Sequence, residues 1–229
     1  MESYPHSKTP LPEKENSPIA QFEIGDYKNF VYLILDWAGK KAAIVDPQND
    51  LTLPLSTLTR NGFELTHIFL THTHFDHIAG VPQLVKTHPH ALIVVHRDEL
   101  HRMDHFVMGH AEIKSVQDGD LIQVGQLQIK AHHTPGHSSG ECSYFLSTTP
   151  PYLFTGDTLF IRDCGRTDLP TGSNKEMFQS LQKLRKLDPN SIILPGHHYQ
   201  EEYHSTLAVE LKISPPLQCK TVEELASLP

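Results

Sequence analysis

Four side chains that commonly bind metal ions lie within residues 71–80, THTHFDHIAG. They are His72, His74, Asp76 and His77, and they directly follow the apolar run IFL. In a regular strand His72, His74 and Asp76 would share one face. A turn from that strand into a helix would bring His77 round to the same point. Neutral imidazole and carboxylate oxygen suit zinc, iron or manganese and need no thiolate, so this spacing predicts a metal site at a strand end.

Three further candidates each stand beside a glycine in the same strand-end context. They are His137 in HHTPGHSSG, Asp157 in FTGDT and His197 in ILPGHHY. Glycine permits close backbone approach and unusual dihedral angles where a loop must aim one side chain inward. An isolated loop histidine is seldom a ligand, but with the first four residues these three make seven donors. Seven donors are enough for two complete sets of metal ligands.

The elements that must position these donors alternate between strand and helix in the first half of the chain. Apolar, β-branched runs joined by the short turn AGKK predict a β-hairpin. The segment ELTHIFLTH reads as a buried strand that delivers the first donors, and the pattern after Asp76 predicts a helix that starts at the motif. The predicted elements are strands at 30–37 and 42–47, a helix at 51–60, a strand at 64–72, the helix after Asp76 and a strand at 91–96.

The second half begins with a pattern of period two between Val116 and Pro135. Turn residues at Asp118-Gly119 and at Gly125 make this segment a β-hairpin or a meander. Two more strands extend that sheet, and a helix, a strand and a second helix follow. These predicted elements are strands at 142–147 and 152–157, a helix at 174–187, a strand at 191–197 and a helix from about Gln200.

Each half therefore ends a buried strand in histidine or aspartate, which predicts two central mixed sheets packed face to face with helices outside. This is an α/β fold of the four-layer αβ/βα sandwich type. With 229 residues the chain is long enough for one large domain. The polar, proline-rich start predicts a flexible arm at residues 1–18, followed by the domain at 19–212 and a C-terminal tail at 213–229 that packs on it.

Composition argues against several classes of function. A formal net charge of −8 leaves no basic surface for nucleic acid, and no apolar run approaches the roughly 20 residues that span a bilayer. The first residues lack the basic and apolar regions of a secretory signal, which predicts a cytoplasmic protein. Cys142, Cys164 and Cys219 are widely spaced, so neither a disulfide framework nor a thiolate metal site is expected.

The order HxHxDH, then His, Asp and His, resembles that of the metallo-β-lactamase-fold hydrolases over roughly residues 22–210. This resemblance implies the sandwich fold and a site with two divalent metal ions, either zinc or a mixture of iron and manganese. It implies that His72, His74 and His137 hold one metal, that Asp76, His77 and His197 hold the other, and that Asp157 bridges the two.

Two segments, TGDTLFIRDCGRTDLPTGSNKEMFQSLQKL and LPGHHY, are similar to the glyoxalase II and persulfide dioxygenase branch of that superfamily. The resemblance implies a small-molecule substrate such as a glutathione conjugate, and hydrolysis of a thioester such as a hydroxyacylglutathione. Two divalent ions about 3.5–4 Å apart lower the pKa of a bridging water, so hydroxide is available at neutral pH. Asp76 is predicted to orient that hydroxide and to accept its proton.

The main alternative is an iron-dependent persulfide dioxygenase of sulfur metabolism. In that family a single Fe(II) is held by two histidines and a carboxylate, which map onto His72, His137 and Asp157. A lactonase is a weaker alternative. The glyoxalase II family also carries a C-terminal helical region with glutathione contacts, whereas 32 residues follow His197 in this sequence. A homodimer is compatible with each of these functions.

Three residues outside the ligand motifs each have two interpretations. Asp46, in IVDP, either orients a ligand histidine or forms an Asx-type turn before Pro47. Arg166, in CGRTD, either anchors a substrate carboxylate or forms a salt bridge with Asp168. Tyr199, just after the last ligand motif, either lines the substrate pocket or is a packing residue.

Overall fold

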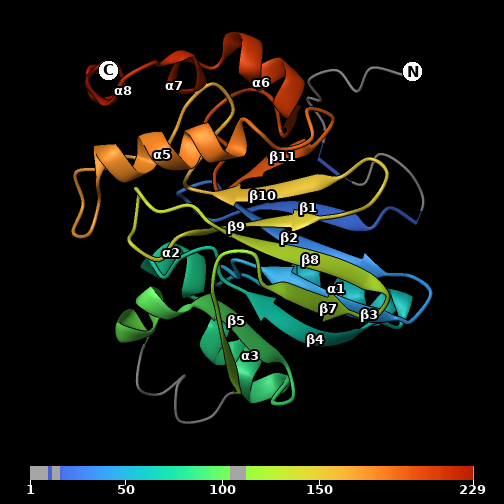
Figure 1. Ribbon diagram of the computed structural model, residues 1–229. Helices are drawn as coiled ribbons and strands as arrows, with labels where there is room; N and C mark the ends of the chain where they lie inside the picture. Colours follow the sequence, from blue (N-terminus) through green and yellow to red (C-terminus); the bar gives the residue numbers. More distant parts are fainter. Residues whose placement is uncertain (1–9, 12–15, 104–111, 229) are drawn as a thin grey trace.

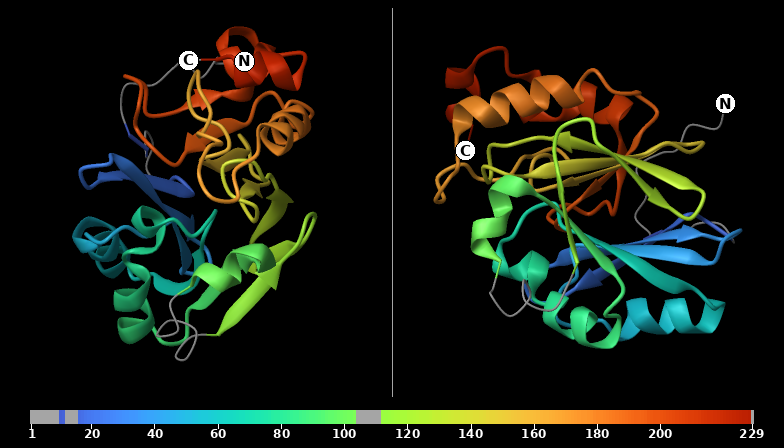
Figure 2. Two further views of the ribbon diagram at one scale, coloured as in Figure 1. Left: turned by 90° about the vertical axis from the view of Figure 1, so that its left-hand side faces the viewer. Right: turned by 60° about the horizontal axis from the view of Figure 1, so that its bottom comes forward.

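Two six-stranded β-sheets packed face to face form the centre of the protein (Figure 1). The computed structural model describes residues 10–11, 16–103 and 112–228. Helices cover the outer face of each sheet, as the two views of Figure 2 show. The predicted four-layer αβ/βα sandwich with two mixed sheets is therefore confirmed.

The first sheet has the strand order β1-β2-β3-β4-β5-β6. Its first three strands pair antiparallel, whereas β3, β4, β5 and β6 run parallel. Helix α1 connects β3 to β4, and helices α2 and α3 connect β4 to β5. The elements are β1 (Ile19–Ile24), β2 (Asn29–Asp36), β3 (Lys41–Val45), α1 (Thr52–Asn61), β4 (Glu64–Phe69), α2 (Phe75–Ile78), α3 (Val81–Thr87), β5 (Leu92–His96), the 3₁₀ helix η1 (Arg97–Arg102) and β6 (Ile113–Val116).

The second sheet has the strand order β12-β11-β10-β9-β8-β7, in which only β10 and β11 run parallel. Helices α5, α6, α7 and α8 cover its outer face, at the top of Figure 1. Of the helices in the described ranges, none combines the length and the apolar composition needed to cross a bilayer. The elements are β7 (Leu121–Val124), β8 (Leu127–His133), β9 (Cys142–Leu146), β10 (Tyr152–Gly156), α5 (Asn174–Leu184), β11 (Ile192–Pro195), β12 (Ser205–Thr206), α6 (Leu207–Ile213), α7 (Pro215–Gln218) and α8 (Val222–Ala226).

Strand β2 shows how the layers are held together, because all eight of its residues are buried. Successive side chains of a strand point to opposite faces. Phe30 and Tyr32 pack between the two sheets, and Val31 and Leu33 pack under the helices that cover the first sheet. A strand that is buried on both faces reads as a continuous apolar run, which is the pattern of FVYLIL in the sequence.

The ends of five strands bring the predicted donors and Asp46 to one edge of the two sheets. Strands β3 and β4 run parallel in the first sheet, and β8, β10 and β11 share one direction in the second. The carboxyl ends of strands that run in one direction meet at the same edge of a sheet. Helix α2 lies at this edge, between the two sheets at the left of Figure 1. Five loops from distant parts of the chain therefore end in one place.

The edge strands β1 and β6 of the first sheet have no counterpart among the predicted elements. The helix predicted from about Gln200 is also wrong, because α6 begins at Leu207. Residues Ser205–Thr206 first pair with β11, and the side chain of Thr206 then accepts a hydrogen bond from the N–H of Val209. This cap defines the start of the helix.

The single helix predicted after Asp76 is two short helices, α2 and α3. The N–H of Gly80 donates to the backbone oxygen of Pro47 instead of continuing α2. A Cβ at this position would lie 2.3 Å from the backbone oxygen of Gln48, so the close approach requires glycine. The break fixes α2 as a short unit next to the donors.

Parts of the predicted N-terminal arm and of the predicted C-terminal tail pack on the two sheets and their helices. Leu11 is buried between the sheets, and its backbone oxygen accepts a hydrogen bond from the N–H of Gln21. Leu217 and Leu225, on α7 and α8, belong to the apolar cluster that α5 forms with the second sheet. Most of the predicted arm lies outside the described residues. The division into an arm at 1–18, a domain at 19–212 and a tail at 213–229 stays a prediction.

Replacing Phe154 by alanine should destabilise the protein strongly. Phe154 is fully buried between the sheets, and its ring meets the ring of Tyr32 edge-on at 5.3 Å. The cavity left by such a change costs about 3–5 kcal/mol of unfolding free energy, which urea unfolding followed by circular dichroism would measure. The control Leu121→Ala removes a side chain that is 53% exposed and should cost less than about 1 kcal/mol. Equal losses for the two variants would contradict the packing described here.

Candidate metal centre

All seven predicted donors lie together at the edge where the five loops meet. The loop after β4 carries two of them, α2 carries two, and the loops after β8, β10 and β11 carry one each. One is half-buried and the other six are buried. The seven are His72, His74, Asp76, His77, His137, Asp157 and His197.

His72, His74 and His137 form the first donor set. Their ligand nitrogens all lie within 4.8 Å of one another, and Nδ1 of His74 is 2.9 Å from Nε2 of His137. Nε2 of His72 is buried, and no described residue offers it a hydrogen bond. A buried nitrogen without a partner costs folding free energy unless a ligand completes it. The set has the composition of a three-histidine metal site.

Asp76, His77 and His197 form the second donor set. Nε2 of His77 lies 3.2 Å from Nε2 of His197, and both nitrogens lie 3.5 Å from Oδ2 of Asp76. Imidazole nitrogens that face each other this closely either share a proton or point at one cation. Two histidines and a carboxylate suit the same borderline metals as the first set.

The carboxylate of Asp157 lies between the two sets. Its Oδ2 is 3.4 Å from Nε2 of His137 and 3.4 Å from Nε2 of His197, and its Oδ1 is 3.6 Å from Nε2 of His77. Ligands at about 2.05 Å from a tetrahedral metal lie about 3.4 Å apart, so these spacings fit such a shell. Oδ1 has no hydrogen-bond partner among the described residues. The donor atoms therefore suit a site for two metal ions.

Glycines before two of the donors allow the loops to come this close. A Cβ on Gly196 would lie 2.2 Å from Oδ1 of Asp157. Gly156 has a φ of +50°, and a Cβ there would lie 2.6 Å from Oγ1 of Thr71. No side chain fits at such separations, so both glycines are required by the geometry of the site.

Asp46 faces the loop after β4. Its Oδ2 lies 3.0 Å from Nδ1 of His77 and accepts a hydrogen bond from the hydroxyl of Thr71. Its Oδ1 accepts a hydrogen bond from the N–H of Thr71. Both oxygens are thus turned toward β4 and α2 rather than toward the residues after Pro47. This geometry favours the role of orienting a ligand histidine over an Asx-type turn.

Backbone oxygens orient two further histidines. The oxygen of Arg166 accepts a hydrogen bond from Nδ1 of His137 at 2.8 Å. The oxygen of Tyr27 accepts one from Nδ1 of His197 at 2.9 Å. A proton held on Nδ1 leaves the lone pair of Nε2 free, and in both residues Nε2 is the nitrogen that faces Asp157.

Burial and neighbouring charges set the protonation of the donors. Burial lowers the pKa of His72 well below its usual value and lowers the pKa of His74 to about 4. Both rings are therefore neutral at pH 7. Burial would also lower the pKa of His77, but Asp157 and Asp46 outweigh it and raise this pKa to about 9. The carboxylates that favour a proton on His77 would equally favour a metal ion in its place.

Glu99, which the sequence does not single out, ties two ligand loops together. Its Oε2 accepts hydrogen bonds from the N–H and the hydroxyl of Thr73, at 3.0 and 2.5 Å. Its Oε1 accepts from the hydroxyl of Ser138 and from the N–H of Gly140, at 2.8 and 3.0 Å. Burial raises the pKa of Glu99, but the bonds from Thr73 and Ser138 outweigh it and hold the pKa below its usual value. In the sequence Glu99 lies within RDELHR and reads as a surface residue.

Asn29 and Glu141 also support donors without belonging to a recognisable motif. The side-chain amide of Asn29 is buried and donates to Oδ2 of Asp76 at 3.0 Å. Oε1 of Glu141 accepts the N–H of Asp157 at 2.5 Å. Burial and the nearby Asp157 raise the pKa of Glu141 well above its usual value. Asn29 therefore positions Asp76, and Glu141 positions Asp157.

A cavity of about 560 Å³ opens over the donors, and Arg166 and Tyr199 are part of its wall. Arg166 also forms the salt bridge that its sequence context suggests, with Nε and Nη2 at 2.6 and 2.7 Å from the carboxylate of Asp168. Tyr199 stacks on His197 with 4.8 Å between ring centroids. Both side chains can meet a bound molecule, and their contacts with substrate stay a prediction.

The fold and the order of the donors match a known family. The family model of the Metallo-beta-lactamase superfamily matches residues 24–197, which contain all seven donors. The chain belongs to the metallo-β-lactamase superfamily. The resemblance stated from the ligand motifs is thereby confirmed.

Individual members of the superfamily resemble this chain over most of its length. A hydroxyacylglutathione hydrolase from Erwinia tasmaniensis is 36% identical over 171 residues, which are 75% of this chain and only 62% of that hydrolase. A probable polyketide biosynthesis zinc-dependent hydrolase, PksB, from Bacillus subtilis is 31% identical over 76% of this chain and 74% of its own length. The crystal structure of ETHE1 from Myxococcus xanthus has a TM-score of 0.80 and 29% identity, and the match covers 92% of both chains. These relatives indicate a metallo-hydrolase or a related enzyme.

Removing one donor from each part of the site should lower the metal content. We expect His72→Ala and Asp157→Ala to bind less metal, because the first loses a donor of one set and the second loses the carboxylate between both sets. Elemental analysis of the purified variants measures metal ions per chain. His90→Ala serves as the control, since His90 is exposed and lies on no donor loop. Full metal content in both donor variants would contradict the assignment.

Replacing Glu99 by alanine should destabilise the protein by about 3 kcal/mol or more, since buried hydrogen-bond donors on two loops lose their acceptor. Asp98→Ala removes the exposed neighbouring carboxylate and should cost less than about 1 kcal/mol.

The contribution of Glu99 to stability should also depend on pH. Because folding lowers the pKa of Glu99, its negative charge stabilises the folded protein fully at neutral pH and progressively less as the pH falls through the folded pKa. The stability difference between the wild type and Glu99→Gln, measured in urea, should therefore shrink between pH 7 and pH 4. A constant difference would show that the charge is not involved.

Proposed function

We propose that this member of the superfamily is a two-metal hydrolase of thioesters, for example of a hydroxyacylglutathione. The observation that supports it most is the arrangement under the cavity, where two donor sets of three residues each flank one carboxylate. Zinc, or a mixture of iron and manganese, suits these donors. His72, His74 and His137 would hold one ion, Asp76, His77 and His197 the other, and Asp157 would bridge them.

Two divalent ions in these sets would supply a water molecule that ionises near neutral pH and a Lewis acid for the substrate carbonyl. Asp76 is the residue that we assign to orient the attacking water and accept its proton, because it lines the cavity beside both nitrogens of its set. Asn29 donates to the same carboxylate oxygen and holds it in position. Asp46 keeps His77 turned toward the site from behind.

The wall of the cavity favours a leaving group that departs without strong acid catalysis. The phenols of Tyr27 and Tyr199 stand beside the second donor set, and partial burial raises the pKa of Tyr199 to about 12. A phenol this weakly acidic is a poor proton donor to a departing amine or alkoxide. The guanidinium groups of Arg102 and Arg166, in the opposite wall, stay protonated in proteins. A thiolate leaves without a proton, so a thioester suits this site better than an amide.

An iron-dependent persulfide dioxygenase is the second candidate. The match to ETHE1 covers 92% of both chains, whereas the match to the hydroxyacylglutathione hydrolase covers 62% of that enzyme. A single Fe(II) could be held by His72, His137 and Asp157, two histidines and a carboxylate. A lactonase is a weaker candidate. For each of these functions we expect a cytoplasmic enzyme, and a homodimer is compatible with all of them.

Elemental analysis followed by two activity assays distinguishes the candidates. The full chain is purified from cells grown with zinc, iron and manganese all available, and its metal content is measured. We expect two metal ions per chain and hydrolysis of S-lactoylglutathione that is lost in Asp76→Asn and kept in His90→Ala. Loss of an acid–base group of this kind typically lowers kcat by about 10²- to 10⁴-fold.

A single tightly bound iron with oxygen uptake on glutathione persulfide would establish the dioxygenase instead. Two bound metals without hydrolysis of any thioester would overturn the proposed function.

A further inference from the structure

The cavity over the donors has two walls of different chemistry. Beside the second donor set stand three aromatic side chains, those of Tyr27, Phe75 and Tyr199. Beside the first donor set stand Arg102 and Arg166, the latter through its backbone contact with His137. A bound molecule that reaches both donor sets must therefore lie against one apolar and one charged wall.

The aromatic wall is held in place by the donor residues themselves. Phe75 lies between His74 and Asp76 in the sequence and begins α2. The backbone oxygen of Tyr27 accepts a hydrogen bond from His197. The ring of Tyr199 stacks on the ring of His197, with 5° between the two planes. The backbone of Tyr27 and of Phe75 and the ring of Tyr199 are thus positioned by the donor residues before any ligand binds.

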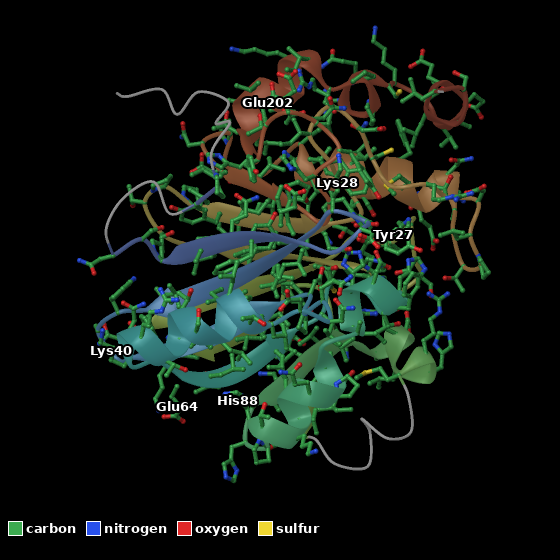
Figure 3. All side chains as sticks on the ribbon, turned by 180° about the vertical axis from the view of Figure 1, so that it is seen from behind. Tyr27, Lys28, Lys40, Glu64, His88 and Glu202 are labelled. Atoms are coloured by element: carbon green, nitrogen blue, oxygen red, sulfur yellow. The ribbon has the colours of Figure 1, made fainter. Side chains whose placement is uncertain are left out.

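These rings are exposed to an unusual degree for aromatic residues. Phe75 is 66% exposed, Tyr27 55% and Tyr199 53%, and they are the three aromatic members among the large exposed apolar side chains of the described residues. The rings of Tyr27 and Phe75 meet edge-on at 5.5 Å, where the turn between β1 and β2 lies next to α2 (Figure 3). Apolar side chains gathered at the mouth of a cavity indicate a surface that a ligand covers.

The cations of the opposite wall already have partners. Nη2 of Arg102 donates to the backbone oxygen of Pro170 and to the hydroxyl of Thr171. Nη1 lies 3.8 Å from the carboxylate of Glu99 and has no hydrogen-bond partner among the described residues. Arg166 is paired with Asp168 through two hydrogen bonds. Each guanidinium is thus matched by one carboxylate, and the wall has little net charge to attract the two carboxylates of a glutathione group.

We propose that Tyr27, Phe75 and Tyr199 form a subsite for an aromatic or branched apolar substituent next to the scissile carbonyl. This inference rests on the thioester hydrolysis proposed above. Among thioesters, it ranks those with such a substituent ahead of the glutathione thioesters. The substituent can belong to the acyl half or to the thiol half of the thioester, since both halves flank the carbonyl. Burying an aromatic ring against three aromatic side chains supplies the binding free energy that the paired arginines do not.

The test compares thioesters that differ by one aromatic ring. In the acyl arm, phenylacetyl and acetyl thioesters of N-acetylcysteamine are hydrolysed by the metal-loaded full chain. In the thiol arm, the acetyl thioesters of 2-phenylethanethiol and of ethanethiol are compared. We expect the ring to raise kcat/KM roughly 10-fold or more in one of the two arms. That arm identifies which half of the thioester, acyl or thiol, places its substituent in the subsite. Phe75→Ala and Tyr27→Ala should reduce this ratio toward one, and the control Leu121→Ala should leave it unchanged.

Two outcomes would overturn the inference while the proposed function stands: a ratio near one in both arms of the wild type, or acetylglutathione as the best substrate. Binding measured by calorimetry tests the subsite without turnover, and phenylacetate should bind roughly 10-fold more tightly than acetate in the wild type but not in Phe75→Ala. If no thioester is hydrolysed and phenylacetate still binds in this way, the hydrolase proposal fails and the apolar subsite remains. If the two acids bind equally and the ring raises kcat/KM in neither arm, the subsite is wrong.

Discussion

The buried carboxylate of Asp157 is the group around which the edge of the two sheets is arranged. Removing a carboxylate from water costs several kcal/mol unless its new surroundings compensate. Here nitrogens of His77, His137 and His197 lie 3.4–3.6 Å from its oxygens. His77, His197 and His72 hold its pKa well below the usual range against the effect of burial. These histidines come from loops of both sheets. Compensation of this one charge therefore requires that the two sheets pack against each other.

The donors were predictable because their information is local. HxHxDH places four ligand types within six residues, and glycine marks the loops before Asp157 and His197. The residues that support the donors were not predictable, because each of them contacts a partner that is distant in the sequence. Glu99 binds Thr73, and Asn29 binds Asp76, and only the closed fold brings these pairs together. The edge strands were missed for a similar reason, since β1 and β6 become strands by pairing with β2 and β5.

The donors and part of the cavity wall come from the same short segments. Phe75 occupies one of the two unspecified positions of the HxHxDH motif, and Tyr199 follows the last histidine donor by two residues. The donors on either side fix the backbone, so a substitution at these positions changes the cavity wall and leaves the donor atoms in place. A chain with this architecture can alter the shape of its cavity without altering the set of groups at its floor.

The distribution of the donors along the chain has a consequence for the order in which the site is completed. Each set takes two side chains from the first half of the sequence and one from the second. His137 completes the first set, and His197 completes the other 60 residues later. While the chain is being synthesised, one set is therefore whole when its neighbour still lacks a member. Two donor sets that lie side by side in the finished protein are therefore completed at different points of synthesis.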